Sequence, residues 1–221
     1  NLGCCGVESS TDEEGTVTTH TYGDLKQLDQ TIRLGVTNLF VYDVQGNTVR
    51  HGVAADGRTR WTGSAFDAAG RATAVTNPLG HATHYAYSTD TEGGPVVTTT
   101  FADGSTRIET SYRDGRPKSI AGTAAHPRVF EYGVESDGPY EIEYLGVDTN
   151  ATEWVKTTSD RLGRVITVQY ADGHTVSNRY DAFGRQTVTD DGARAMLTAY
   201  DDSGHPLRSA IDMDRDGEIE S

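Results

Sequence analysis

The motif YDAFGR (Tyr180 to Arg185) places a carboxylate and a guanidinium four residues apart, at Asp181 and Arg185. A carboxylate beside a cation is a pairing that general acid–base catalysis uses, because the neighbouring charge sets the carboxyl pKa. A catalytic pair is needed at one place in a chain. Whether this spacing occurs once or many times therefore decides between chemistry and architecture.

A second stretch, DMDRDGEIE (Asp212 to Glu220), has the residue types of a calcium loop. Its acids, followed by Gly217, match positions 1, 3, 5 and 6 of an EF-hand-type loop, and position 12 would fall beyond Ser221. The alternative is one more acidic Asp-x-x-Gly turn, since Asp214 and Gly217 fit the next repeat loosely. The candidate ligands, with the acid after the glycine included, are Asp212, Asp214, Asp216 and Glu218.

Cys4 and Cys5 are the only cysteines, and they are adjacent. Three alternatives remain open: a vicinal disulfide, disulfides to other segments, or two reduced thiols. Either disulfide would suit an oxidising compartment. Zinc is not expected, because a structural zinc site usually takes four protein ligands.

The YDAFGR motif recurs along the chain as YDVQGN, FDAAGR and YDDSGH, with weaker copies in YRDGR and SDRLGR. Its glycines lie 24, 45, 48, 21 and 20 residues apart, and each long gap has glycines near its middle. The period is therefore about 20 to 25 residues, the length of one supersecondary unit. Lys26 stands at the glycine position of a decayed copy, YGDLKQ, while Arg113 and Ser159 also depart from the motif.

A second kind of turn (ADGSTR, PLGHAT, ADGHTV) alternates with the first, so the chain reverses every 8 to 12 residues. The segments between turns are rich in Val, Thr and Tyr. VITVQY (Val165 to Tyr170) alternates between two faces, as a half-buried strand does. Asp24 to Arg33 has a short helical stripe, but the repeat register favours a strand pair. We predict an all-β chain of repeated antiparallel hairpins.

Each motif residue has a structural use in such a hairpin. The Asp carboxylate accepts backbone N–H bonds as in an Asx turn, and the Gly supplies a positive φ. Tyr ends the incoming strand and gives it a packing face, and Arg begins the outgoing strand. The predicted structural turns are Asp43–Gly46, Asp67–Gly70, Asp181–Gly184 and Asp201–Gly204.

The charge balance limits the partners. With 33 acidic and 19 basic residues the formal net charge is −14, which argues against nucleic acid and anionic membranes as partners. No apolar run reaches the roughly 18 residues of a membrane-spanning helix. The first residue is Asn rather than Met, so we expect a fragment of a longer chain.

The repeated motif resembles the tyrosine–aspartate (YD) repeats of RHS proteins. Phe66 to Tyr87, with its NPLG turn, is similar to one complete family repeat. The resemblance implies a β-hairpin strip that spirals into part of a solenoid-like shell or shaft. Such shells occur in bacterial toxin systems around a toxic domain, in insecticidal toxin complexes, and in teneurins.

The resemblance further implies a non-catalytic structural segment of a secreted or cell-surface bacterial protein. Residues 1–221 would form one YD-repeat domain, residues 1–21 the tail of a preceding repeat, and 212–221 the acidic loop. Partners would be adjacent repeats, copies of the chain joined at open strand edges, or an enclosed toxin domain. No cofactor is expected apart from calcium at the acidic loop.

An alternative function is an adhesion module. Exposed tyrosines stack on sugars, so Tyr42, Phe66, Tyr180 and Tyr200 are candidate glycan-contacting residues as well as packing residues. An enzyme is the remotest alternative, because every acid pair falls at a predicted turn.

Overall fold

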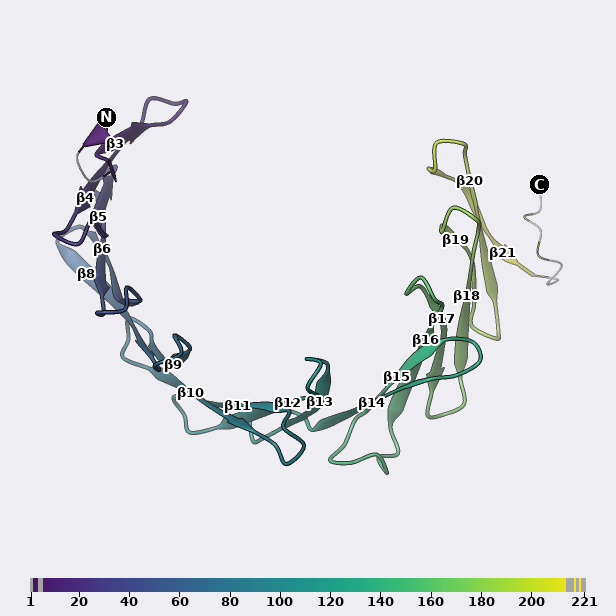
Figure 1. Cartoon of the computed structure of the whole chain (residues 1–221). Helices are drawn as coiled ribbons and strands as arrows, with labels where there is room; N and C mark the ends of the chain where they lie inside the picture. The colour runs from purple at the N-terminus through teal and green to yellow at the C-terminus, as the bar shows by residue number, and fades with distance from the viewer. Residues whose placement is uncertain (1, 4–5, 214–216, 218, 220–221) are drawn as a thin grey trace. The chain divides into compact units, whose positions relative to one another are not determined.

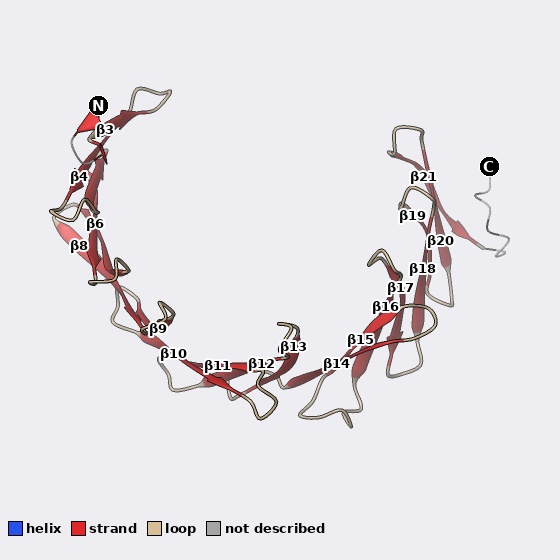
Figure 2. Ribbon diagram, viewed as in Figure 1, coloured by secondary structure: helices blue, strands red, loops and turns tan. Residues whose placement is uncertain are grey.

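The computed structural model describes residues 2–3, 6–213, 217 and 219. The described residues form strands and turns and no helix, so none of them forms a helix that could span a membrane. The predicted all-β fold is thereby confirmed (Figure 2). The strands are β1 (Leu2–Gly3), β2 (Gly6–Val7), β3 (Ser9–Thr11), β4 (Val17–Tyr22), β5 (Leu28–Arg33), β6 (Val36–Tyr42), β7 (Thr48–Ala55), β8 (Arg58–Phe66), β9 (Ala72–Thr76), β10 (Ala82–Thr89), β11 (Pro95–Thr100), β12 (Thr106–Ser111), β13 (Pro117–Ala121), β14 (Arg128–Val134), β15 (Pro139–Tyr144), β16 (Trp154–Ser159), β17 (Val165–Tyr170), β18 (Thr175–Tyr180), β19 (Gln186–Asp190), β20 (Ala195–Tyr200) and β21 (Pro206–Asp212).

The chain divides into two compact units. Unit 1 contains residues 1–88 and 97–107, and unit 2 contains residues 89–96 and 108–221. In unit 1, β3 to β10 pair in chain order, each strand antiparallel to the next. In unit 2 the same pattern continues from β12 to β21 (Figure 1). Each unit is thus a run of hairpins.

The stretch with the helical stripe is extended. A turn occupies Gly23 to Gln27, and β5 follows directly at Leu28 and pairs with β4 and β6. The strand pair favoured by the repeat register is confirmed. Strand pairing on both sides outweighs the helical pattern here, because a stretch of about ten residues is too short to form a stable helix by itself.

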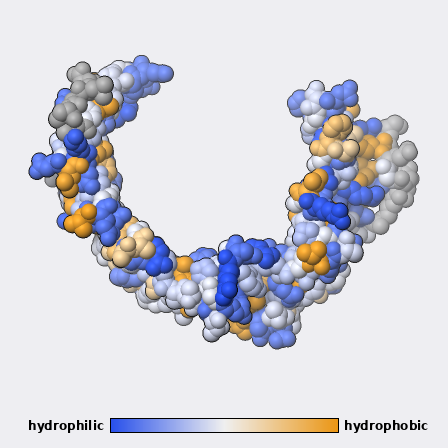
Figure 3. Space-filling model, viewed as in Figure 1, coloured by the Kyte–Doolittle hydropathy of each residue, from blue (hydrophilic) through white to orange (hydrophobic). Residues whose placement is uncertain are grey.

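The sheets have little core. Among the described residues, the hydrophobic side chains that are buried are Phe130, Ala195 and Leu197, and no large side chain is completely buried. The chain exposes 14644 Å², whereas a globular monomer of 23.8 kDa exposes about 9,900 Å². Polar and apolar residues alternate over the visible surface (Figure 3). Folded domains normally pack a sheet against a second layer, and the described residues of neither unit supply that layer.

Candidate functional site

The corner around Asp181 shows what its carboxylate does. The N–H of Asp181 donates to the carbonyl of Arg185, and the N–H of Gly184 donates back to the carbonyl of Asp181. One carboxylate oxygen, Oδ1, accepts the N–H groups of Phe183 and Arg185, both at 2.9 Å. The other, Oδ2, accepts Nε of Arg185 at 2.6 Å. Both oxygens are therefore bonded to donors of their own turn.

This five-residue corner recurs. Twelve turns among the described residues share its two backbone hydrogen bonds. In each, the N–H of residue 1 donates to the carbonyl of residue 5, and the N–H of residue 4 donates to the carbonyl of residue 1. In eight of them an Asp or Asn at the first position accepts the N–H groups of residues 3 and 5. These first residues are Asp12, Asp43, Asp67, Asn77, Asp90, Asp160, Asp181 and Asp201.

The glycine at position 4 is left-handed in the predicted turns. Gly46, Gly70, Gly184 and Gly204 have φ values between +76° and +86°. A side chain in this region costs about 1–2 kcal/mol per residue, a cost that glycine avoids. Lys26, which stands at the glycine position of the first decayed copy, adopts φ of +61° and completes the same corner. The departure at Lys26 is accommodated by backbone strain rather than by a different turn.

A second version of the corner moves the acid by two residues. At Phe101–Ser105, Tyr112–Arg116 and Tyr170–His174 the acid lies at position 3 and accepts the backbone N–H of residue 5. At the first two corners the side chain of residue 5 also donates to the acid. YRDGR therefore belongs to this second version. Its Tyr112 occupies the first corner position, where YDAFGR has its aspartate.

The tyrosines connect one corner to the previous one. The hydroxyl of Tyr42 donates to the carbonyl of Leu28 at 2.8 Å, and that of Tyr180 donates to the carbonyl of Val165 at 2.8 Å. Leu28 and Val165 are the first residues after the preceding corner on the same side of the sheet. The same bond joins Tyr87 to Ala72 and Tyr200 to Gln186. We call this bond the tyrosine staple.

The last residue of a corner covers the ring of the next tyrosine. Arg164 lies 4.7 Å from the ring centre of Tyr180, and Arg71 lies 4.3 Å from that of Tyr87. Arg185 lies 4.8 Å from the ring centre of Tyr200 and also donates to the carbonyl of Asp201 at 3.1 Å. The arginine thus bonds its own aspartate and stacks on the following repeat, instead of pairing with an acid across the sheet.

The corner bonds lower the carboxyl pKa values. The side chain of Asn47 is the largest cause at Asp43, and the side chain of Arg71 is the largest at Asp67. At Asp181 burial opposes the shift, but the N–H and guanidinium of Arg185 outweigh it and the pKa is lowered. These carboxyl groups are held as anions, the form that accepts hydrogen bonds.

Three of the four aromatic residues proposed for glycan contact have partners within the sheet. In the tyrosine staples the hydroxyls of Tyr42, Tyr180 and Tyr200 are bonded to backbone, and arginines cover the rings of the latter two. Phe66 ends β8 at the same place in its hairpin, without a hydroxyl. The three tyrosines therefore connect neighbouring repeats, and glycan contact stays a prediction.

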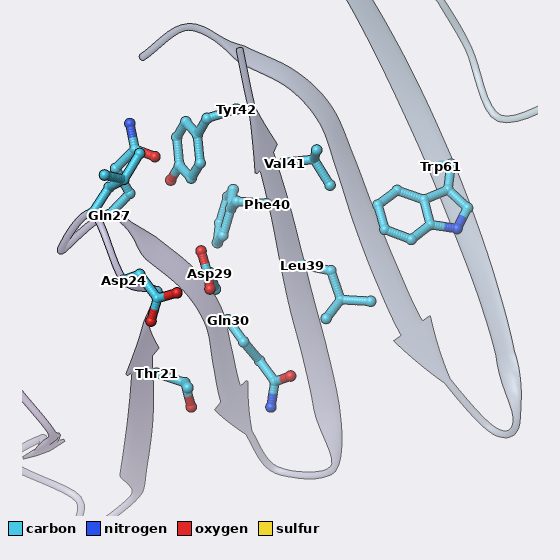
Figure 4. Close-up of a pocket in the computed structure, with 12 residues that line it drawn as sticks. Thr21, Asp24, Gln27, Asp29, Gln30, Leu39, Phe40, Val41, Tyr42 and Trp61 are labelled. Carbon is cyan, nitrogen blue, oxygen red and sulfur yellow. The ribbon is translucent and has the colours of Figure 1, made fainter. Parts of the chain in front are cut away.

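A hollow of about 580 Å³ in unit 1 combines the residue types of a sugar site (Figure 4). Its lining includes Trp61 and Phe40 together with Asp24, Asp29 and Gln30. Phe40 stacks on a histidine of β7 at 5.0 Å. Trp61 lies over a glycine of β7 on one side, with Arg50 4.5 Å from its ring centre. These aromatic rings are occupied by neighbours within the sheet.

The predicted calcium site is only partly described, and the predicted cysteine site is not described. Asp214, Asp216, Glu218, Cys4 and Cys5 lie outside the described residues. Asp212 is buried, and its Oδ2 accepts the N–H of Gly217 at 3.0 Å. Among the described residues no three His, Cys, Asp or Glu side chains form a metal-binding group. Calcium binding stays a prediction.

Sequence reasoning missed two corners and the staple. Asp12 and Asp90 cap corners that lack the preceding tyrosine. The Asp-x-x-Gly spacing of TDEEGT and TDTEGG would have revealed both. The staple has a signal as well, because each stacked tyrosine follows its arginine by 15 or 16 residues.

The comparisons with known proteins bear on the fold. No protein-family model and no curated protein matches the sequence. The crystal structure of TcdB2-TccC3 without its hypervariable C-terminal region matches with a TM-score of 0.57 and 18% identity. The match covers 91% of this chain and 12% of that chain. This similarity to an RHS/YD-repeat shell protein confirms the family resemblance at the level of the fold.

Two further solved structures match this chain more weakly. The crystal structure of TcdB2-TccC3-Cdc42 is 16% identical, with a TM-score of 0.32, over 90% of this chain and 16% of that chain. The Tc holotoxin pore of Photorhabdus luminescens is 14% identical, with a TM-score of 0.24 and the same shares covered.

Proposed function

We propose that this chain, which has the fold of RHS/YD-repeat shells, is a non-catalytic structural segment of a larger protein and forms part of a β-shell wall. The observation that carries the proposal is the recurrence of one corner and one staple in both units. A catalytic constellation requires one site, whereas a wall requires the same connection at each repeat.

The exposed area supports the proposal. The chain exposes about 1.5 times the area of a globular protein of its mass. A single layer with so few buried side chains gains little from hydrophobic burial. Its hairpins depend on backbone pairing and on connections between neighbours, as in repeat proteins whose stability is a sum of nearest-neighbour terms. Such a layer suits a wall that is completed by further repeats.

The state of the polar groups also favours a wall over an enzyme. At Asp181 both carboxylate oxygens are bonded within the corner, and Arg185 is shared between its own aspartate and the next repeat. A general acid or base needs a carboxyl that can exchange a proton with a substrate. The lowered pKa of Asp181 keeps the group ionised instead.

A role in a shell wall also implies a location for the parent protein and a set of partners. We infer that the parent protein is secreted or surface-exposed, that adjacent repeats are the chain's immediate partners, and that the wall encloses a toxin domain. An adhesion role has less support, because most of the candidate aromatic rings are covered by arginine or bonded to backbone.

Matched isosteric variants in the complete protein test the proposal. Asp67→Asn, Asp160→Asn and Asp181→Asn each remove a charge from an equivalent corner. We expect all three to increase cleavage by an added protease to a similar degree, because each loosens one connection of the wall. Asp181→Asn alone abolishing a catalytic activity, with protease resistance unchanged, would contradict the proposal.

A further inference from the structure

Strand β8 of unit 1 has an outer edge that is left unpaired at its beginning. The pairing of β8 with β9 starts at Gly63, opposite Thr76, so Arg58 to Thr62 pair with β7 alone among the described residues. The first three of these residues, Arg58 to Arg60, are exposed. An unpaired strand edge presents N–H and C=O groups that can pair with an added strand.

The turn before β8 decides which of these backbone groups point outward. Asp56 and Gly57 have φ values of +50° and +71°, as in a two-residue type I′ hairpin. The residues that flank such a turn exchange both backbone hydrogen bonds, so Arg58 bonds inward to β7, and the direction alternates along the strand. The groups that face outward are therefore those of Thr59 and Trp61.

The side chains of Arg58 and Arg60 lie together on one face of this edge. Their cross-strand neighbours on β7 are Ala55 and Val53, which carry no charge. With Asp56, these four residues line a hollow of about 560 Å³. No ion pair joins either arginine to another described residue, whereas several other arginines of the chain are paired with acids. Two guanidinium groups are thus available to carboxylates from outside the sheet.

We infer that the outer edge of β8 binds an extended acidic segment of another polypeptide, with carboxylates at alternate positions facing Arg58 and Arg60. The segment adds as an antiparallel strand, the pairing that β8 makes with β7 and β9. In such a pair, residues directly opposite each other on one face have Cβ atoms about 4.5–5.5 Å apart, and opposite charges there attract. The inference adds a binding activity to the proposed wall and does not depend on it.

Two features of the edge specify this occupant. Charged side chains on an edge strand normally discourage strand addition. At β8 the effect is selective, because an acidic strand neutralises both arginines whereas a neutral or basic strand does not. The outward backbone groups favour a polypeptide over an anionic polymer of another class, because a polypeptide offers matching donors and acceptors in register.

Strand β15 supplies the sequence of a probe, because its Glu141 and Glu143 alternate with Tyr140, Ile142 and Tyr144. Within the chain β15 is paired on both sides, so the sequence is used as a free peptide. The labelled peptide PYEIEYLG, residues 139–146, is titrated with the whole chain and followed by fluorescence polarisation. We expect saturable binding. The peptide with Glu141→Gln and Glu143→Gln should bind about 2- to 20-fold more weakly, the value of two exposed ion pairs.

Variants of the chain assign the binding to the two arginines. Arg58→Gln combined with Arg60→Gln should weaken binding of the glutamate peptide by a similar factor and leave binding of the glutamine peptide unchanged. Arg161→Gln is the matched control, since it removes an exposed arginine from a corner of unit 2 and should not alter the affinity.

Amide hydrogen exchange measured by NMR separates strand addition from a purely ionic contact. Saturation with the glutamate peptide should protect the amides of Thr59 and Trp61, the residues whose backbone groups face outward. The amide of Arg60, which already bonds to β7, should change less.

Four results would overturn the inference. The first is no saturable binding up to about 1 mM peptide, and the second is equal binding of the glutamate and glutamine peptides. The third is binding without protection of Thr59 and Trp61, which would assign the arginines to an anionic ligand that is not a strand. The fourth is protection that rises with the concentration of the chain alone, which would assign the edge to a second copy.

Discussion

The carbonyl of Val165 offers a sharp test of the tyrosine staple, because two side chains donate to it. Tyr180 donates its hydroxyl at 2.8 Å and Asn178 its Nδ2 at 3.1 Å. A carbonyl oxygen has two lone pairs and can accept both. Removing either donor leaves the other in place, whereas removing both leaves a partly buried carbonyl without a side-chain donor.

We therefore predict that Tyr180→Phe and Asn178→Ala are non-additive. A typical hydrogen bond contributes about 0.5–1.5 kcal/mol net, and an unsatisfied buried acceptor costs about 1–3 kcal/mol. Tyr180→Phe alone should cost about 0.5 kcal/mol, at the low end, because Asn178 remains. The double variant should lose about 0.5–1.5 kcal/mol more than the sum of the single variants.

The assay is urea unfolding followed by tryptophan fluorescence. The chain has two tryptophans, and Trp154 lies in unit 2 together with the altered residues. Trp61→Phe in every variant makes Trp154 the single reporter. Tyr42→Phe, read through Trp61 with Trp154→Phe, is a matched control, since no second side-chain donor to Leu28 accompanies Tyr42 among the described hydrogen bonds. Additive losses at Val165 would refute the shared-acceptor reasoning, and no loss from either tyrosine change would refute the staple.

The remaining predictions concern the corners and the sheet. Lys26→Gly should stabilise unit 1 by about 0.5–1 kcal/mol in urea unfolding, because it removes the left-handed strain of a side chain at φ of +61°. The control Leu25→Gly, one residue earlier, should destabilise unit 1. Equal effects of the two substitutions would contradict the strain argument. Gly138→Ala should destabilise unit 2 by about 3 kcal/mol or more, because residue 138 has φ of +146° and the new Cβ would lie 1.9 Å from the Ser159 carbonyl oxygen. The control Gly63→Ala should cost far less, because its Cβ would lie 3.7 Å from the nearest atom. The stability of the chain should fall in acid. The pKa values of Asp43, Asp67 and Asp181 are lower in the folded chain than the ordinary value of 3.8. The three ionised carboxylates therefore contribute fully to stability above pH 3.8, and this contribution is lost as the pH falls through their lowered pKa values. Thermal unfolding between pH 7 and pH 2 measures this, and a midpoint independent of pH below about 4 would show that the corner bonds do not stabilise the fold.

The repeat and the strands could be predicted from the sequence because they depend on local rules. Alternation in VITVQY and the left-handed glycine of Asp-x-x-Gly are properties of a few adjacent residues. The strand at Leu28–Arg33 was decided by the repeat register against a competing helical stripe, and the structure confirms it.

The tyrosine staple was not found from the sequence, because it depends on which residues meet across strands and its only signal is a spacing of 14 or 15 residues. Tyr180 and Val165 are 15 positions apart, and their contact follows from the pairing of β17 with β18. Arg185 likewise has a local partner, Asp181, which the four-residue spacing suggests, and a distant one, Tyr200, which it does not. The role of YDAFGR as a connector between repeats therefore emerges only from the three-dimensional arrangement.

The most direct test of the shell proposal is an electron cryo-microscopy structure of the complete protein that contains this chain. The account predicts that β21 continues into a neighbouring strand by antiparallel pairing and that the sheets form part of one continuous β wall. A separate, closed domain in which Asp181 and Arg185 face a substrate cleft would contradict it.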